Sequence, residues 1–158
     1  MANGTRTLTL VIVLIVGVAV GWFLGRGAPT LATTCPTPGD HIIEVGPKAA
    51  DVSDPKAAIS MMKGHKVFWT SKDETRALRI TFKASDFPAG GEPPFEGGQP
   101  GRDQVITCNP GGVCKSGRIN PNLKPPECPR SLYYKYWQTL IDKDGKEETA
   151  DAGIIIEK

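Results

Sequence analysis

One apolar run dominates the chain. Residues 8–24, LTLVIVLIVGVAVGWFL, contain neither a charged residue nor a proline. A helix of this length extends about 26 Å at about 1.5 Å per residue, close to the ~30 Å hydrocarbon core of a bilayer. We therefore expect residues 1–27 to form a single transmembrane anchor that the mature protein retains. A cleaved signal peptide fits less well, because its apolar core is shorter and the motif Thr30-Leu31-Ala32 is a poor cleavage site. A lipoprotein signal ending at Cys35 is also a weak match.

The expected anchor carries two further features. Gly17, Gly21 and Gly25 recur at every fourth position and so share one helix face, where a second helix can approach closely. Glycine is common in membrane helices in general, so this face has a second, unspecific explanation. Trp22 and Phe23 lie where an aromatic belt meets the lipid headgroups. The predicted partners are the lipid bilayer and other transmembrane subunits.

The rest of the chain is long enough for one domain. Residues 28–40 are rich in Pro, Thr and Gly and read as a linker, which leaves residues 41–158 for a domain with a single core. Of the 19 basic residues, only Arg6 and Arg26 precede residue 28, so the rest of the chain contains 17 basic and 17 acidic residues. A neutral domain without a Lys/Arg run gives no electrostatic reason to bind nucleic acid or an anionic lipid surface.

Four cysteines follow the anchor and indicate the compartment. Cys35, Cys108, Cys114 and Cys128 are even in number and lie among Pro and Gly, as disulfide cysteines of exported proteins do. Cys108 can pair with Cys114 and leave Cys128 for Cys35, or Cys128 can pair with Cys108 or with Cys114; spacing does not choose. We expect a bacterial inner-membrane protein with a cytoplasmic amino terminus and a periplasmic carboxy-terminal domain.

Short β-strands separated by turn residues fill this domain. Alternation is clearest in Leu78, Ile80 and Phe82, with polar residues between them. The Pro/Gly-rich segment 84–103 is expected to be a long loop that Phe95 holds to the domain. The pattern predicts an all-β antiparallel sandwich. The expected strands lie at residues 41–45, within 49–62, and at 65–70, 78–82, 104–107, 117–119, 131–141 and 153–157.

The order of motifs resembles the cupredoxin fold of blue-copper proteins. The resemblance rests on Val67-Phe68-Trp69, on Tyr134-Lys135-Tyr136 and on the closing run Gly153 to Glu157, and it covers roughly residues 42–158. It implies a Greek-key sandwich in which the Tyr-x-Tyr motif lies on the penultimate strand and the Gly-x-Ile motif on the last.

The copper chemistry of that family does not carry over. A blue-copper site needs two imidazoles and a thiolate. Arg76-Ala77-Leu78 stands near the place of the first His ligand, and Gln138 stands where the ligand Cys belongs. Both histidines, His41 and His65, precede the ligand positions. We therefore expect no metal, no cofactor and no catalytic residue. The pairs Asp73-Glu74 and Glu147-Glu148 are expected to be solvated turn charges.

Together these features predict a non-catalytic, single-span accessory subunit of a larger bacterial membrane complex. A photosynthetic reaction-centre or light-harvesting assembly, or a respiratory one, is suggested by analogy alone. Phe95, Tyr133 and Trp137 are candidate partner contacts. The alternatives are a membrane-tethered electron-transfer cupredoxin and a free-standing envelope module that binds a ligand.

Overall fold

The computed structural model describes residues 37–88, 91–126 and 130–158. Within these ranges, no helix has the length and apolarity needed to cross a membrane. The expected anchor over residues 1–27, with its glycine face and its aromatic pair, lies outside the described residues. Most of the linker, Cys35 and Cys128 also lie outside them.

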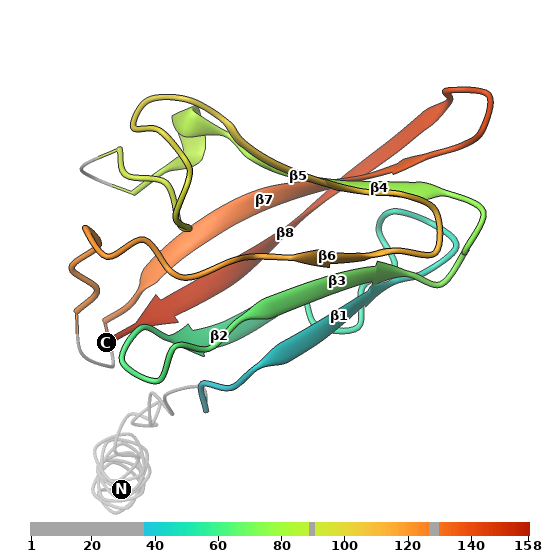
Figure 1. The fold of residues 1–158 in the computed structure, drawn as a ribbon. Coiled ribbons are helices and arrows are strands. Elements are labelled where there is room, and N and C mark those ends of the chain that lie inside the picture. Colours follow the sequence, from blue (N-terminus) through green and yellow to red (C-terminus); the bar gives the residue numbers. More distant parts are fainter. Residues whose placement is uncertain (1–36, 89–90, 127–129) are drawn as a thin grey trace, which may run out of the picture. The chain divides into compact units, whose positions relative to one another are not determined.

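The described chain forms a two-layer β-sandwich (Figure 1). One sheet has three strands in the order β1-β3-β6, and the other has five in the order β2-β8-β7-β4-β5. The strands are β1 His41–Val45, β2 Lys56–Ser60, β3 Val67–Ser71, β4 Ala77–Phe82, β5 Gln104–Cys108, β6 Val113–Lys115, β7 Leu132–Ile141 and β8 Glu147–Glu157, and a short 3₁₀ turn, η1, spans Ala84–Asp86.

Both sheets are mixed, which corrects the prediction of a purely antiparallel sandwich. β1 runs parallel to β3, with His41 opposite Val67, and β2 runs parallel to β8, with Lys56 opposite Gly153. All other pairings of named strands in the described residues are antiparallel. The difference arises because β1 and β2, consecutive in sequence, lie in different sheets. Neither strand can therefore form a hairpin with the other.

Three strand predictions need revision. The ambiguous segment 49–62 contributes only the five residues of β2. The expected strand at 117–119 is limited to an isolated bridge between Ile119 and Phe95, whereas Val113–Lys115 pairs as β6. β8 begins at Glu147 rather than at Gly153. Its first half, EETADA, is polar because it extends the β7–β8 hairpin. Backbone pairing with β7, rather than burial of side chains, stabilises this half.

The core between the sheets is built around four aromatic rings. Trp69, Phe82, Phe95 and Tyr136 are all fully buried. Their ring centroids lie 5.5 to 6.4 Å apart, mostly in edge-to-face arrangements. Such pairs contribute about 0.5–1.5 kcal/mol each beyond their buried area. Trp69, the largest of the four, and Phe82 each contact the other three rings.

The long β4–β5 loop is held to the sandwich, as expected, by Phe95. The Gln104 side chain accepts a hydrogen bond from the Phe95 amide and donates one to its carbonyl, at 3.2 and 2.9 Å. The Asn120 side-chain Nδ2 donates to the Pro93 carbonyl, and the Tyr134 hydroxyl donates to the Glu92 carbonyl, both at 3.0 Å. These contacts satisfy backbone groups that a Pro/Gly-rich segment cannot pair within a ladder.

Candidate functional site

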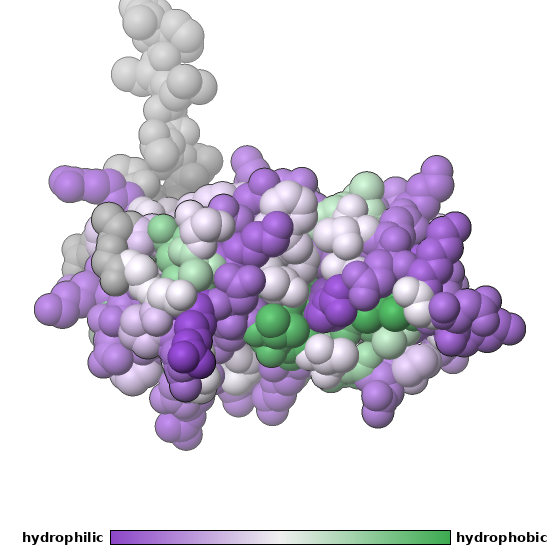
Figure 2. All heavy atoms as spheres, turned by 90° about the horizontal axis from the view of Figure 1, so that it is seen from above, coloured by the Kyte–Doolittle hydropathy of each residue, from purple (hydrophilic) through white to green (hydrophobic). Residues whose placement is uncertain are grey.

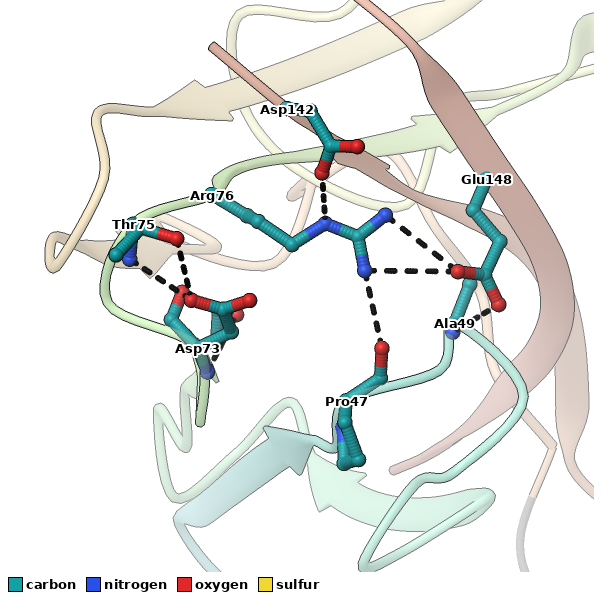
Figure 3. A network of polar contacts seen from close by, with 8 residues as sticks. Pro47, Ala49, Asp73, Thr75, Arg76, Asp142 and Glu148 are labelled. Atoms are coloured by element: carbon teal, nitrogen blue, oxygen red, sulfur yellow. Dashed lines mark hydrogen bonds and ion pairs between the residues drawn. The ribbon is translucent and has the colours of Figure 1, made fainter.

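A buried arginine joins three loops at the end of the sandwich where β7 turns into β8 (Figure 3). The Arg76 side chain is only 11% exposed. Its Nε lies 2.5 Å from an Asp142 oxygen, and its Nη2 lies 3.4 Å from Glu148 Oε2. Its Nη1 donates to the Pro47 carbonyl at 3.0 Å. The Asp142 contact is an ion pair rather than an aligned hydrogen bond, because the buried Nε–H has no acceptor in line.

The β3–β4 turn positions this arginine. The Asp73 carboxylate accepts hydrogen bonds from the Thr75 amide and hydroxyl, at 3.0 and 2.6 Å, and the Asp73 amide donates to Ser71 Oγ. These hydrogen bonds from Thr75, above all that of its hydroxyl, lower the pKa of Asp73. The turn is thereby fixed one residue before Arg76, so the guanidinium projects toward the β1–β2 connection.

Glu147 and Glu148 do more than the solvated turn charges that the sequence suggested. Glu148 pairs with Arg76 and accepts a hydrogen bond from the Ala49 amide at 3.0 Å. Glu147 lies 2.6 Å from Arg79 Nη2. The sequence signal that could have identified these ion pairs is Arg76 itself. It directly precedes an apolar alternating strand, and a charge close to the core needs a partner.

Gln138 reinforces the same connection from inside the core. Its side chain is fully buried, and its amide nitrogen donates to the Ala49 carbonyl. Among the described residues, neither its Oε1 nor the Trp69 indole N–H nor the Tyr136 hydroxyl has a hydrogen-bond partner. Arg76 and Gln138 therefore both bind the β1–β2 connection. We call this pair of residues the Arg76–Gln138 clamp.

The residues at this end do not fit a copper ion. A guanidinium and a primary amide stand where the resemblance would place an imidazole and a thiolate, and neither is a ligand that copper favours. Both histidines are engaged elsewhere. His41 lies 2.8 Å from Asp54 and also contacts the Ala58 carbonyl, while His65 accepts from the Ser60 amide. No group of three or more His, Cys, Asp or Glu within the described ranges could hold a metal ion.

One disulfide joins the edges of the two sheets. Cys108 ends β5, the outer strand of the five-stranded sheet, and Cys114 lies on β6, the outer strand of the other. The bond confirms the expected pairing of Cys108 with Cys114 and excludes those of Cys128 with Cys108 or Cys114. The expected pairing of Cys128 with Cys35 lies outside the described residues and stays a prediction. A disulfide indicates an oxidising, extracytoplasmic compartment for the domain.

Removing this disulfide should destabilise the domain moderately. We expect the Cys108→Ser/Cys114→Ser variant to lose about 2 kcal/mol of its free energy of unfolding, since the bond closes a short loop. Urea denaturation followed by circular dichroism measures the change. Wild type and variant should have the same midpoint when both are reduced, and equal midpoints for the two proteins under oxidising conditions would contradict a stabilising role.

Two buried tyrosines should make the domain sensitive to alkali. Burial raises the pKa of Tyr134 and of Tyr136 from 10.0 to about 12, with the Glu92 charge adding to the effect at Tyr134. At Tyr136 the Trp69 indole opposes this increase, although the two groups are not aligned as a hydrogen bond. Below pH 10 the tyrosines are neutral in both the folded and the unfolded state, and the domain has its full stability. As the pH rises from 10 toward 12, the unfolded state loses these protons more readily than the folded state, so the free energy of unfolding decreases.

The measurement is the urea midpoint at about pH 9 and about pH 11, on either side of the ordinary tyrosine pKa. We expect a clear decrease for the wild type and a smaller one for the Tyr134→Phe/Tyr136→Phe variant. The Tyr133→Phe variant, altered at an exposed tyrosine, is the matched control. The same decrease in all three proteins would show that other groups cause the effect.

The three candidate partner contacts differ in position. Phe95 is fully buried within the domain, where it packs against the other core rings. Tyr133 is 48% exposed and covers Gly153, where a Cβ atom would come within 2.3 Å of its ring. Trp137 is half-buried. Lys83 and Lys135 lie 4.0 and 4.4 Å from its ring centroid, and its indole N–H donates to Asp86.

The face shown in Figure 2 carries hydrophobic side chains only in small groups that hydrophilic ones separate. Large continuous apolar patches are the usual mark of a permanent protein interface. This face therefore offers no broad apolar contact surface.

Comparisons with models of known protein families, with curated proteins and with solved structures found no match.

Proposed function

We propose that the chain is a non-catalytic, single-span accessory subunit of a larger bacterial membrane complex, such as a photosynthetic or respiratory assembly. Residues 1–27 anchor it in the inner membrane with a cytoplasmic amino terminus, and a periplasmic, copper-free cupredoxin-like domain contacts neighbouring proteins. The observation that carries the proposal is the Arg76–Gln138 clamp. It occupies the end of the sandwich that would hold the reactive centre of a blue-copper protein.

The cupredoxin-like assignment is supported by where the three motifs lie. Val67-Phe68-Trp69 is on β3, Tyr134-Lys135-Tyr136 is on the penultimate strand β7, and Gly153 to Glu157 closes the last strand β8. These are the strands that the resemblance requires. The electron-carrier alternative needs a copper centre, with which Arg76 and Gln138 are chemically incompatible.

Gentle detergent solubilisation tests the proposal directly. An affinity-tagged full-length chain should co-purify with a constant set of transmembrane proteins and without stoichiometric copper. The Gly17→Leu/Gly21→Leu/Gly25→Leu variant should lose these partners, because three side chains would fill the face through which another helix approaches.

Ala19→Leu is the matched control, since position 19 lies on the opposite face of the expected helix. It should retain the partners. Retention by the glycine variant as well would remove this face from the proposal, and a wild-type chain that purifies alone would contradict the subunit role.

A further inference from the structure

Two grooves flank the β2–β3 turn, at the end of the sandwich opposite Arg76. Both are lined by Met61 and Met62, and Met62 is 79% exposed. The charged residues that line the first groove are Lys63, Lys66 and Arg118. Those that line the second, which has a volume of about 790 Å³, are Lys124, Arg130 and Lys158. Among the described residues that line the two grooves, none has an acidic side chain.

Most of these cations have no ion-pair partner among the described residues. Within the described ranges, Lys63, Lys66, Arg118, Lys124 and Arg130 take part in none of the ion pairs. Lysine and arginine side chains that gather around a concave surface create a positive potential that attracts anions. The fold produces this concentration from segments far apart in sequence, so the sequence contains no basic run that corresponds to it.

The chain enters the domain at this same end. The Asp40 side chain accepts a hydrogen bond from the Lys66 amide at 2.8 Å, and the His41 amide donates to the Lys66 carbonyl. The first described residues are therefore adjacent to the methionine turn. Between an anchor that ends at residue 27 and the domain at residue 37, nine residues can extend at most about 30 Å.

We propose that this end, the Met61–Lys66 turn with its two cationic grooves, docks on the anionic phospholipid headgroups of the membrane that holds the anchor. The grooves bind phosphodiester groups through lysine and arginine, and Met62, an apolar and flexible side chain, inserts at the boundary between headgroups and acyl chains. The inference rests on the proposed anchor over residues 1–27. Docking at this end directs the Arg76 end away from the membrane.

Hydrogen exchange of the full-length chain in nanodiscs tests this docking. One set of discs contains phosphatidylcholine alone, and the other adds phosphatidylglycerol. In the anionic discs, amide exchange in peptides covering residues 60–67 and 117–126 should slow by a factor of about five or more, the factor expected for even one basic residue attracted to an anionic surface. About 1 M salt should abolish the difference, since the screening length falls to about 3 Å.

Charge reversal supplies the matched variants. Lys63→Glu/Arg118→Glu/Lys124→Glu should lose the protection. Lys48→Glu/Lys143→Glu/Lys146→Glu, which changes the net charge equally with exposed lysines of the connections near Arg76, should keep it. The salt dependence of the wild type provides the same test without any substitution.

Each failure has a different meaning. A full-length chain that does not co-elute with the discs overturns the anchor and this inference together. Incorporation with equal exchange in both lipids overturns the docking alone. Protection in native membranes but not in protein-free anionic discs assigns the surface to a protein partner, and that also overturns the lipid assignment.

Discussion

The Trp69→Ala variant should lose about 3–5 kcal/mol of its free energy of unfolding, the largest effect that we expect from a single substitution. Trp69 is fully buried and packs against Phe82, Phe95 and Tyr136. Its removal leaves a cavity at the junction of both sheets and of the β4–β5 loop. The surrounding rings are held by their own strands and can fill the space only in part.

Urea denaturation followed by circular dichroism measures this loss. Trp137→Ala is the matched control, because it deletes the same side chain at a half-buried site on the outer face of β7. It should cost clearly less than Trp69→Ala. Equal losses in the two variants would contradict the central position of Trp69 in the core.

The Arg76→Met variant should lose about 2–3 kcal/mol. Methionine preserves much of the side-chain volume but removes the cation that faces two carboxylates and the Pro47 carbonyl. Deleting one member of a fully buried ion pair costs about 3–5 kcal/mol. The expected loss here is smaller, because Asp142 and Glu148 are 36% and 43% exposed and water can solvate them.

Arg79→Met provides the comparison. Arg79 makes a single ion pair, with Glu147, and is 33% exposed, so its replacement should cost less than about 1 kcal/mol. Faster amide exchange at residues 46–52 in Arg76→Met, but not in Arg79→Met, would show that Arg76 holds the β1–β2 connection. Equal stability of the two variants would contradict the clamp.

Strands in which apolar and polar residues alternate strictly were predictable from sequence. Strands whose position depends on the strand they pair with were not. Leu78, Ile80 and Phe82 identified β4, and the aromatic run identified β7, because one buried face imposes a period of two. β6 was missed because three residues beside glycines carry no period, and its position depends on pairing with β3. The parallel pairings of β1 with β3 and of β2 with β8 are likewise between distant segments, and local sequence patterns do not show them.

The candidate site was likewise predictable from sequence only in part. The sequence placed Arg76 and Gln138 at positions where copper ligands would otherwise stand, so their unsuitability for copper was predictable. Their roles in holding Pro47 and Ala49 were not, because these contacts span 29 and 89 residues. The cationic grooves were also missed, since overall charge neutrality conceals a local excess that only folding creates.

The place of β8 in its sheet has a consequence for how the chain acquires its structure. β8 lies between β2 and β7, and Lys56 of β2 pairs with Gly153 near the far end of the sequence. Such distant pairings make the search for the native state slow. The five-stranded sheet is incomplete until β8 joins β2 to β7, so the domain can finish folding only after nearly all of its residues have been synthesised.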